Sequence, residues 1–141
     1  MSLANIQPPA GLTFEPSTIT AAAATTIAVK AVVKVDLSDL TGTTPAVNVA
    51  IAASAGAGIY GVVTNAISAA KDGTVQLGGI ATVIASEAIA EGALVSAVAT
   101  TGKVETADAA EFVVGVACTA AAADADELEV LLTANPTITA V

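Results

Sequence analysis

Short runs in which apolar side chains alternate with polar ones recur along this 141-residue chain. Across residues 27–36 apolar side chains occupy every second position, and Lys30, Lys34 and Asp36 lie between them. Because successive side chains of an extended chain point to opposite faces, this period predicts a half-buried strand. The same alternation predicts further strands at residues 47–51, 75–77 and 127–132.

Two longer apolar runs, at residues 59–63 and 112–117, lack the alternation. Continuous apolar runs of this length are typical of strands that are covered on both faces. Turn residues separate the strands, and no segment sustains a period of 3.6 residues. We therefore expect an all-β fold, a small antiparallel β-barrel or sandwich.

The chain also contains a weak internal repeat. The sequence GVVTNA at residues 61–66 is similar to GVACTA at residues 115–120. Each copy is followed by small residues, an acidic turn (Asp72 and Asp126, respectively) and an apolar strand. Two copies are too few for a solenoid, so we interpret the pattern as a β unit that is duplicated once.

The first 26 residues differ from the rest, with three prolines and one charge, that of Glu15. Proline fixes its own φ and biases the preceding residue away from helix, which favours an extended conformation. We therefore expect an extended N-terminal arm at residues 1–26, a β domain at 27–135 and a C-terminal tail at 136–141.

Charge and hydropathy exclude two classes of partner. Four lysines and no arginine stand against thirteen acidic residues, for a net charge of −9, so the chain should repel a phosphate backbone and bind no nucleic acid. Residues 40–70 are uncharged but are interrupted by glycine, threonine and asparagine, so no membrane partner is expected. The N-terminus lacks a basic secretory signal, which predicts synthesis in the cytoplasm.

Composition also argues against catalysis. The chain has no histidine and a single cysteine, Cys118, which leaves no imidazole base, no cysteine–histidine pair and no cysteine-ligated zinc site. We therefore expect no enzyme activity, no catalytic residue, no cofactor and no metal.

One glycine motif could suggest a dinucleotide. Residues 56–61, GAGIYG, match the G-x-G-x-x-G pattern, in which the third glycine should open a helix. Here Gly61 leads into the β-branched residues Val62 and Val63. We interpret the segment as a loop between two strands.

Three further candidates have simple structural explanations. Residues 124–127, DADE, resemble the start of a calcium loop, but Leu128 and Glu129 occupy positions that need an oxygen ligand and a glycine. An acidic turn before a strand fits better, and residues 36–39 are interpreted as a solvated turn. Cys118 lies among valine and alanine residues and is expected to be a buried small hydrophobe.

The order and spacing of these strands and turns resemble those of a known family, the small decoration (cement) proteins of tailed-phage capsids. The resemblance covers residues 27–132. It is carried by residues 29–36, 61–66, 71–73, 75–79, 82–85, 88–95, 101–104, 114–117 and 129–132.

The resemblance implies a structural virion protein on the outer capsid surface that binds the major capsid protein and cements neighbouring capsomers. The composition is compatible with adhesion. Only 2% of the chain is aromatic, so its core must be rich in alanine and gains little per residue from burial, and self-association adds buried surface. We therefore expect a homo-oligomer, a trimer.

Within the arm, the candidate interface consists of apolar anchors that could lie across a capsid subunit or add to a neighbour's sheet. These anchors are Leu3, Ile6, Pro8, Pro9, Leu12 and Phe14. A disordered tail is the structural alternative. The functional alternative is an exported β-rich pilin or surface-layer subunit, which would need an export route.

Overall fold

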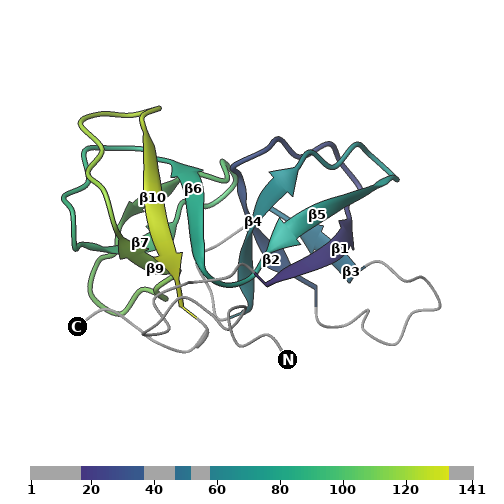
Figure 1. The fold of residues 1–141 in the computed structure, drawn as a ribbon, viewed down its shortest axis with the longest axis horizontal. Coiled ribbons are helices and arrows are strands. Elements are labelled where there is room, and N and C mark those ends of the chain that lie inside the picture. Colours follow the sequence, from purple (N-terminus) through teal and green to yellow (C-terminus); the bar gives the residue numbers. More distant parts are fainter. Residues whose placement is uncertain (1–16, 37–46, 52–57, 134–141) are drawn as a thin grey trace, which may run out of the picture.

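The computed structural model describes residues 17–36, 47–51 and 58–133, and these form ten strands and no helix. This confirms the all-β expectation. Figure 1 shows two lobes side by side, one built from β1–β5 and the other from β6–β10. The strands are β1 (Thr18–Ala22), β2 (Val32–Val35), β3 (Val47–Ala50), β4 (Tyr60–Asn65), β5 (Asp72–Gln76), β6 (Ile80–Ile84), β7 (Leu94–Ala97), β8 (Val104–Thr106), β9 (Gly115–Ala117) and β10 (Glu127–Leu132).

The first five strands close into a barrel in the order β1-β3-β2-β4-β5, which we call barrel 1. β1 pairs antiparallel with β5 and parallel with β3, so it closes the sheet on itself. Its interior is filled by small and β-branched side chains, with Val33, Val63 and Val75 at most 1% exposed. Such side chains suit a narrow barrel interior.

The last five strands form a sheet in the order β6-β10-β9-β7-β8, which we call barrel 2. A parallel bridge between Ala85 and Val104 joins its two outer strands. The amide of Ser86 also donates to the carbonyl of Val104 at 2.8 Å. This bridge occupies the place of the parallel β1–β3 pairing in barrel 1.

The two barrels repeat each other in pairing and in turns. The first strand of each pairs antiparallel with the fifth, and the second pairs antiparallel with both the third and the fourth. Before the second strand, Lys30 donates its amide to Val63 at 2.7 Å, and Gly92 donates to Ala117 at 2.8 Å. Both turn residues have positive φ, 72° and 84°. The duplicated β unit predicted from the sequence is therefore confirmed.

The repeated glycines explain why the internal repeat is still visible in the sequence. Gly61 lies in β4 and Gly115 lies at the equivalent place in β9. A Cβ on Gly61 would lie 2.4 Å from Cγ1 of Val75, and one on Gly115 would lie 2.3 Å from the carbonyl oxygen of Leu131. In both barrels the neighbouring strand approaches too closely for any side chain.

The boundary expected at residue 26 falls inside barrel 1. Thr18–Ala22 forms β1 and pairs along its whole length with β5. The segment Thr18-Ile19-Thr20 is β-branched, which favours a strand, whereas the proline argument bears only on the residues before it. Residues 1–16 and 134–141 lie outside the described residues.

The single strand expected across residues 27–36 is interrupted by a turn. Ile27 forms an isolated bridge with Ile67, and β2 begins only at Val32. Between them, Lys30 has positive φ and Val29 is 44% exposed. The apolar alternation continues through the turn because the residues on both sides of it face the same core.

The two continuous apolar runs, predicted as strands covered on both faces, differ in their burial. In β4, Tyr60, Val62 and Val63 are all buried, so the expectation of a strand covered on both faces is confirmed. In β9, Val116 is 37% exposed, so the same expectation is wrong there. The difference arises because β4 lies between the two barrels and β9 does not (Figure 1).

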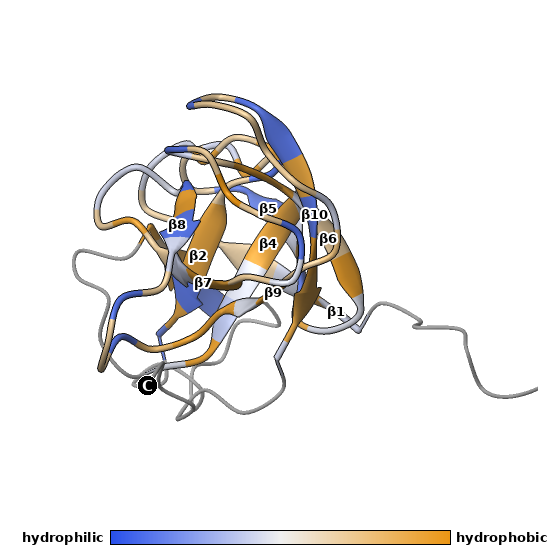
Figure 2. Ribbon diagram, turned by 90° about the vertical axis from the view of Figure 1, so that its left-hand side faces the viewer, coloured by the Kyte–Doolittle hydropathy of each residue, from blue (hydrophilic) through white to orange (hydrophobic). Residues whose placement is uncertain are grey.

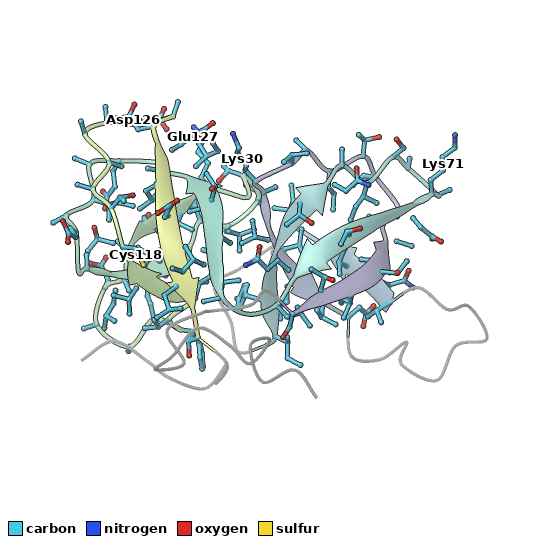
Figure 3. All side chains as sticks on the ribbon, viewed as in Figure 1. Lys30, Lys71, Cys118, Asp126 and Glu127 are labelled. Atoms are coloured by element: carbon cyan, nitrogen blue, oxygen red, sulfur yellow. The ribbon has the colours of Figure 1, made fainter. Side chains whose placement is uncertain are left out.

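The outer face of barrel 1 packs against barrel 2. Val32, Tyr60 and Val62 belong to the same buried cluster as the core of barrel 2. The amide of Val32 donates to the carbonyl of Gly102 at 2.8 Å. An ion pair between Lys30 and Glu127 also joins the barrels, and Figure 3 shows the two side chains meeting at the boundary between the lobes.

Replacing Gly102 by alanine tests this contact between the barrels. Its φ is +75°, and a Cβ would lie 3.0 Å from Cβ of Ala31 in barrel 1. The matched control is Gly92→Ala, with φ +84° and nothing within 4 Å. The left-handed conformation should cost each variant about 1–2 kcal/mol. Urea unfolding should show an additional loss of about 1 kcal/mol for Gly102→Ala; equal losses would contradict the contact.

Candidate functional site

The glycine motif does not form a nucleotide site. Its third glycine, Gly61, lies inside β4, and the strand continues to Asn65. No helix begins there, so no helix N-terminus is available to a pyrophosphate. The interpretation as a loop between two strands is confirmed for residues 58 and 59, which precede β4, and is wrong for Tyr60 and Gly61, which lie within that strand. Residues 56 and 57 lie outside the described residues.

In the acidic turn at residues 124–127, carboxylates accept hydrogen bonds from other groups of the same chain. One carboxylate oxygen of Asp126 accepts from the amides of Ala122 and Ala123 at 2.9 and 3.0 Å. Asp124 accepts from Nζ of Lys103 at 2.6 Å, and this hydrogen bond holds the pKa of Asp124 below its usual value. β10 begins immediately afterwards, which confirms an acidic turn before a strand.

Cys118 is partly exposed, so the expectation that it is buried is wrong. Its Sγ makes only a weak contact, 3.7 Å from the carbonyl oxygen of Val116. Cys118 and Val116 are two positions apart at β9, on the face turned away from the barrel 2 core. This face is uncovered, which accounts for the exposure of both.

Acidic side chains gather around β8, and two of them, Glu87 and Glu111, accept hydrogen bonds from neighbouring segments. Glu87 accepts from the amide of Thr106 at 3.0 Å. Glu111 accepts from the hydroxyl of Ser96 and from the amide of Asp108, each at 2.8 Å. Burial raises the pKa of Glu105, and the charges of Glu111, Glu87 and Asp108 raise it further.

The described part of the chain contains neither a metal-binding cluster nor a membrane-spanning helix. No three histidine, cysteine, aspartate or glutamate side chains there form a group that could hold a metal ion. No helix in those residues could cross a membrane. Of the expected solvated turn at residues 36–39, only Asp36 is described, and it is exposed, with its amide donating to the carbonyl of Asn48 at 2.8 Å.

An apolar row crosses the outer face of barrel 2. Strand register places Ile80 beside Leu131, Leu131 beside Val116, and Val116 beside Leu94. Paired residues of adjacent strands point to the same face, so the four side chains form one continuous row, which we call the outer stripe. Ile80, Val116 and Leu94 are 41%, 37% and 39% exposed, and Leu131 is half-buried.

The stripe crosses β10 toward the end of that strand, where Leu131 pairs with Ile80 and Val116. In Figure 2, β10 changes from hydrophilic at its start to hydrophobic toward its end. Sequence analysis missed the stripe because it joins residues from four strands. The apolar run at residues 112–117 could have indicated the stripe. It predicted a strand covered on both faces, whereas one face of β9 is exposed.

An open pocket of about 330 Å³ lies between the two barrels. Its lining is mostly apolar: Ser17, Ile59, Tyr60, Leu77, Gly78, Val113, Val114 and Thr133. Burial raises the pKa of the Tyr60 hydroxyl. The predicted anchors Leu3, Ile6, Pro8, Pro9, Leu12 and Phe14 lie outside the described residues, which begin at the pocket with Ser17.

These features define a protein of two repeated five-stranded β units, the first a closed barrel and the second a sheet whose edges are joined by one bridge, with no metal-binding group among its described residues. No family model matches the chain, and no curated protein matches its sequence. Among solved structures, it is similar to the crystal structure of the head fiber gp8.5 N base in bacteriophage phi29, with a TM-score of 0.62 and 16% identity. The match covers 86% of this chain and 98% of that one.

At this identity the similarity shows a shared fold. It extends over nearly the whole of the head fiber base, so it includes both barrels rather than one. The resemblance to capsid decoration proteins in particular remains a prediction.

Neutralising Glu105 tests the charge repulsion around β8. Its raised pKa means that the folded state holds this proton more tightly than the unfolded state, so stability falls as pH rises through the folded pKa. Glu105→Gln should therefore stabilise the protein at pH 7, by less than about 1 kcal/mol because solvent screens the charges. The advantage should vanish near pH 3.5, below the ordinary glutamate range of about 4.3.

Urea midpoints at the two pH values measure this effect. Glu129→Gln, an exposed acid on β10, is the matched control and should gain less. An advantage of Glu105→Gln that is the same at both pH values would contradict the explanation.

Proposed function

We propose that the chain is a structural virion protein that binds the outer surface of a phage head, with the major capsid protein as its partner. Its role there is to cement neighbouring capsomers by adhesion, without chemistry. The observation that carries the proposal is the fold similarity to the head fiber base of phage phi29, over 98% of that chain.

Two features of the described residues support a binding role. The outer stripe and the pocket between the barrels offer apolar surface, which drives protein association when it is removed from water. Among the acidic side chains around β8 and in the acidic turn, Glu87, Glu111 and Asp126 accept hydrogen bonds from within the chain, which is a structural role. The net charge of −9 suits a protein lattice better than packaged nucleic acid.

A second candidate function is the base of a projecting head fibre. The similarity to a head fiber base of phage phi29 favours this function. Heating heads with and without bound protein separates the two functions. A cement should raise the temperature at which heads release their DNA, whereas a fibre base should leave it unchanged.

The predicted arm can be tested directly on undecorated heads. Deleting residues 1–14 should weaken co-sedimentation of the protein with heads at least tenfold, because it removes all six apolar anchors. A matched variant keeps the length and the prolines but replaces Leu3, Ile6, Leu12 and Phe14 by serine; it should lose as much binding. Thermal unfolding of both variants, compared with the full chain, separates lost contact with heads from lost stability. Undiminished binding would remove the arm from the proposal.

Self-association is a separate part of the proposal. We expect the purified protein to be a trimer, because a core of alanine and valine gains stability from further burial between copies. Light scattering should give three times the chain mass of 13.5 kDa. A stable monomer at micromolar concentration would contradict this expectation.

A further inference from the structure

The outer stripe has a counterpart in barrel 1. There, strand register places Thr18 beside Gln76, Gln76 beside Val62, and Val62 beside Val32. These four residues occupy the same strands of the repeated unit as Ile80, Leu131, Val116 and Leu94 in barrel 2. The two rows are therefore equivalent surfaces of duplicated barrels.

The two rows differ in what covers them. Val32 and Val62 are each 1% exposed, because they pack into the cluster that includes the core of barrel 2. Gln76 is also buried, and its side-chain amide donates to the carbonyls of Gly78 and Ile80 at 2.8 and 2.9 Å. In barrel 2, the residues equivalent to Val32 and Val62 are Leu94 and Val116, and both remain exposed.

The stripe is also more apolar than its counterpart. Ile80 and Leu131 stand where barrel 1 has Thr18 and Gln76. Large apolar side chains are unfavourable on a row that faces only water. Contiguous exposed apolar surface of this kind marks an interaction site. The equivalent row in this same chain is covered by a barrel of the repeated fold.

Charge separates the two barrels and suggests which barrel covers the stripe. The described residues of barrel 1 and its linker, up to residue 79, hold three lysines and two aspartates. Residues 80–133 hold one lysine and nine acidic residues. Within one chain, the Lys30–Glu127 ion pair already joins a basic side chain of barrel 1 to an acidic side chain of barrel 2. A barrel 1 from another copy is therefore the electrostatically matched neighbour for barrel 2.

From these observations we infer that the outer stripe docks barrel 1 of a second copy of this chain, in a head-to-tail contact. Each copy then offers a stripe at one end and an acceptor barrel at the other. Such a heterologous contact closes into a ring when the rotation between copies permits it. The inference concerns the isolated protein, so it stands or falls separately from binding to a phage head.

Analytical ultracentrifugation of the full chain tests the inference without heads. Leu94→Ser combined with Val116→Thr should weaken self-association at least tenfold. The matched control is Val29→Thr, an apolar residue 44% exposed in barrel 1 and outside both rows, and it should change self-association less than twofold. Equal weakening by both, or a wild-type chain that stays monomeric at 100 μM, would overturn the inference.

A second variant guards against misfolding. Ile80→Thr combined with Leu131→Gln gives the stripe the residues that barrel 1 carries at the equivalent positions, so the fold should accept them. This variant should also associate at least tenfold more weakly, with an unchanged unfolding midpoint. If instead it remains fully associated, the stripe is not the interface.

The single cysteine reports the orientation of the contact. Cys118 lies two residues from Val116 at β9, so a maleimide–succinimide reagent attached there should reach lysines of the docked barrel 1 that lie away from its own barrel 2, such as Lys71 (Figure 3). Mixing ¹⁵N-labelled and unlabelled chains identifies links between copies. Links from Cys118 to these lysines between copies support head-to-tail docking. Efficient Cys118–Cys118 disulfide formation would show a two-fold contact and overturn it.

Discussion

Packing of Val32 and Val62 against barrel 2 is the contact on which the rest of the structure depends. Each barrel is a unit of about 60 residues, a size that buries only about 60% of the surface of its unfolded chain. Its interior is filled by valine and alanine, which contribute less per residue than larger side chains do. Covering the outer row of barrel 1 adds buried apolar surface that neither barrel has alone. The core that contains Val32 and Val62 is therefore shared between the barrels.

Differences between the two copies show where the duplicated unit was adapted. Lys30 has positive φ at a turn where the second copy has Gly92, although a side chain disfavours that conformation by about 1–2 kcal/mol. The side chain of Lys30 forms an ion pair with Glu127 of barrel 2, a contact that glycine could not make. Likewise, the acidic residues are concentrated in barrel 2, so the surfaces of the two barrels are complementary rather than identical.

Much of the fold could be predicted from local patterns. Alternation indicated β3 and β10, and in β10 Leu128, Val130 and Leu132 are buried as expected. The repeat of GVVTNA by GVACTA correctly indicated duplication, because Gly61 and Gly115 meet the same steric demand in each barrel. The turn at Lys30 was missed because the apolar period continues through it.

The candidate surface was much harder to predict. Ile80, Leu94, Val116 and Leu131 are far apart in the sequence, and only strand register brings them into one row. Sequence pattern also cannot distinguish an apolar run covered by the same chain, as in β4, from one left open, as in β9. That distinction depends on how the two barrels pack, which is a property of the tertiary structure.

The central claim is that this two-barrel protein adheres to the outside of a phage head. If the proposal is right, a phage genome encodes the chain, and cryo-electron microscopy of the virions made from that genome tests the claim most directly. The proposal predicts density that fits β1–β10 on the outer face of the shell, in contact with the major capsid protein. Well-resolved virions with no such density on their outer surface would contradict it.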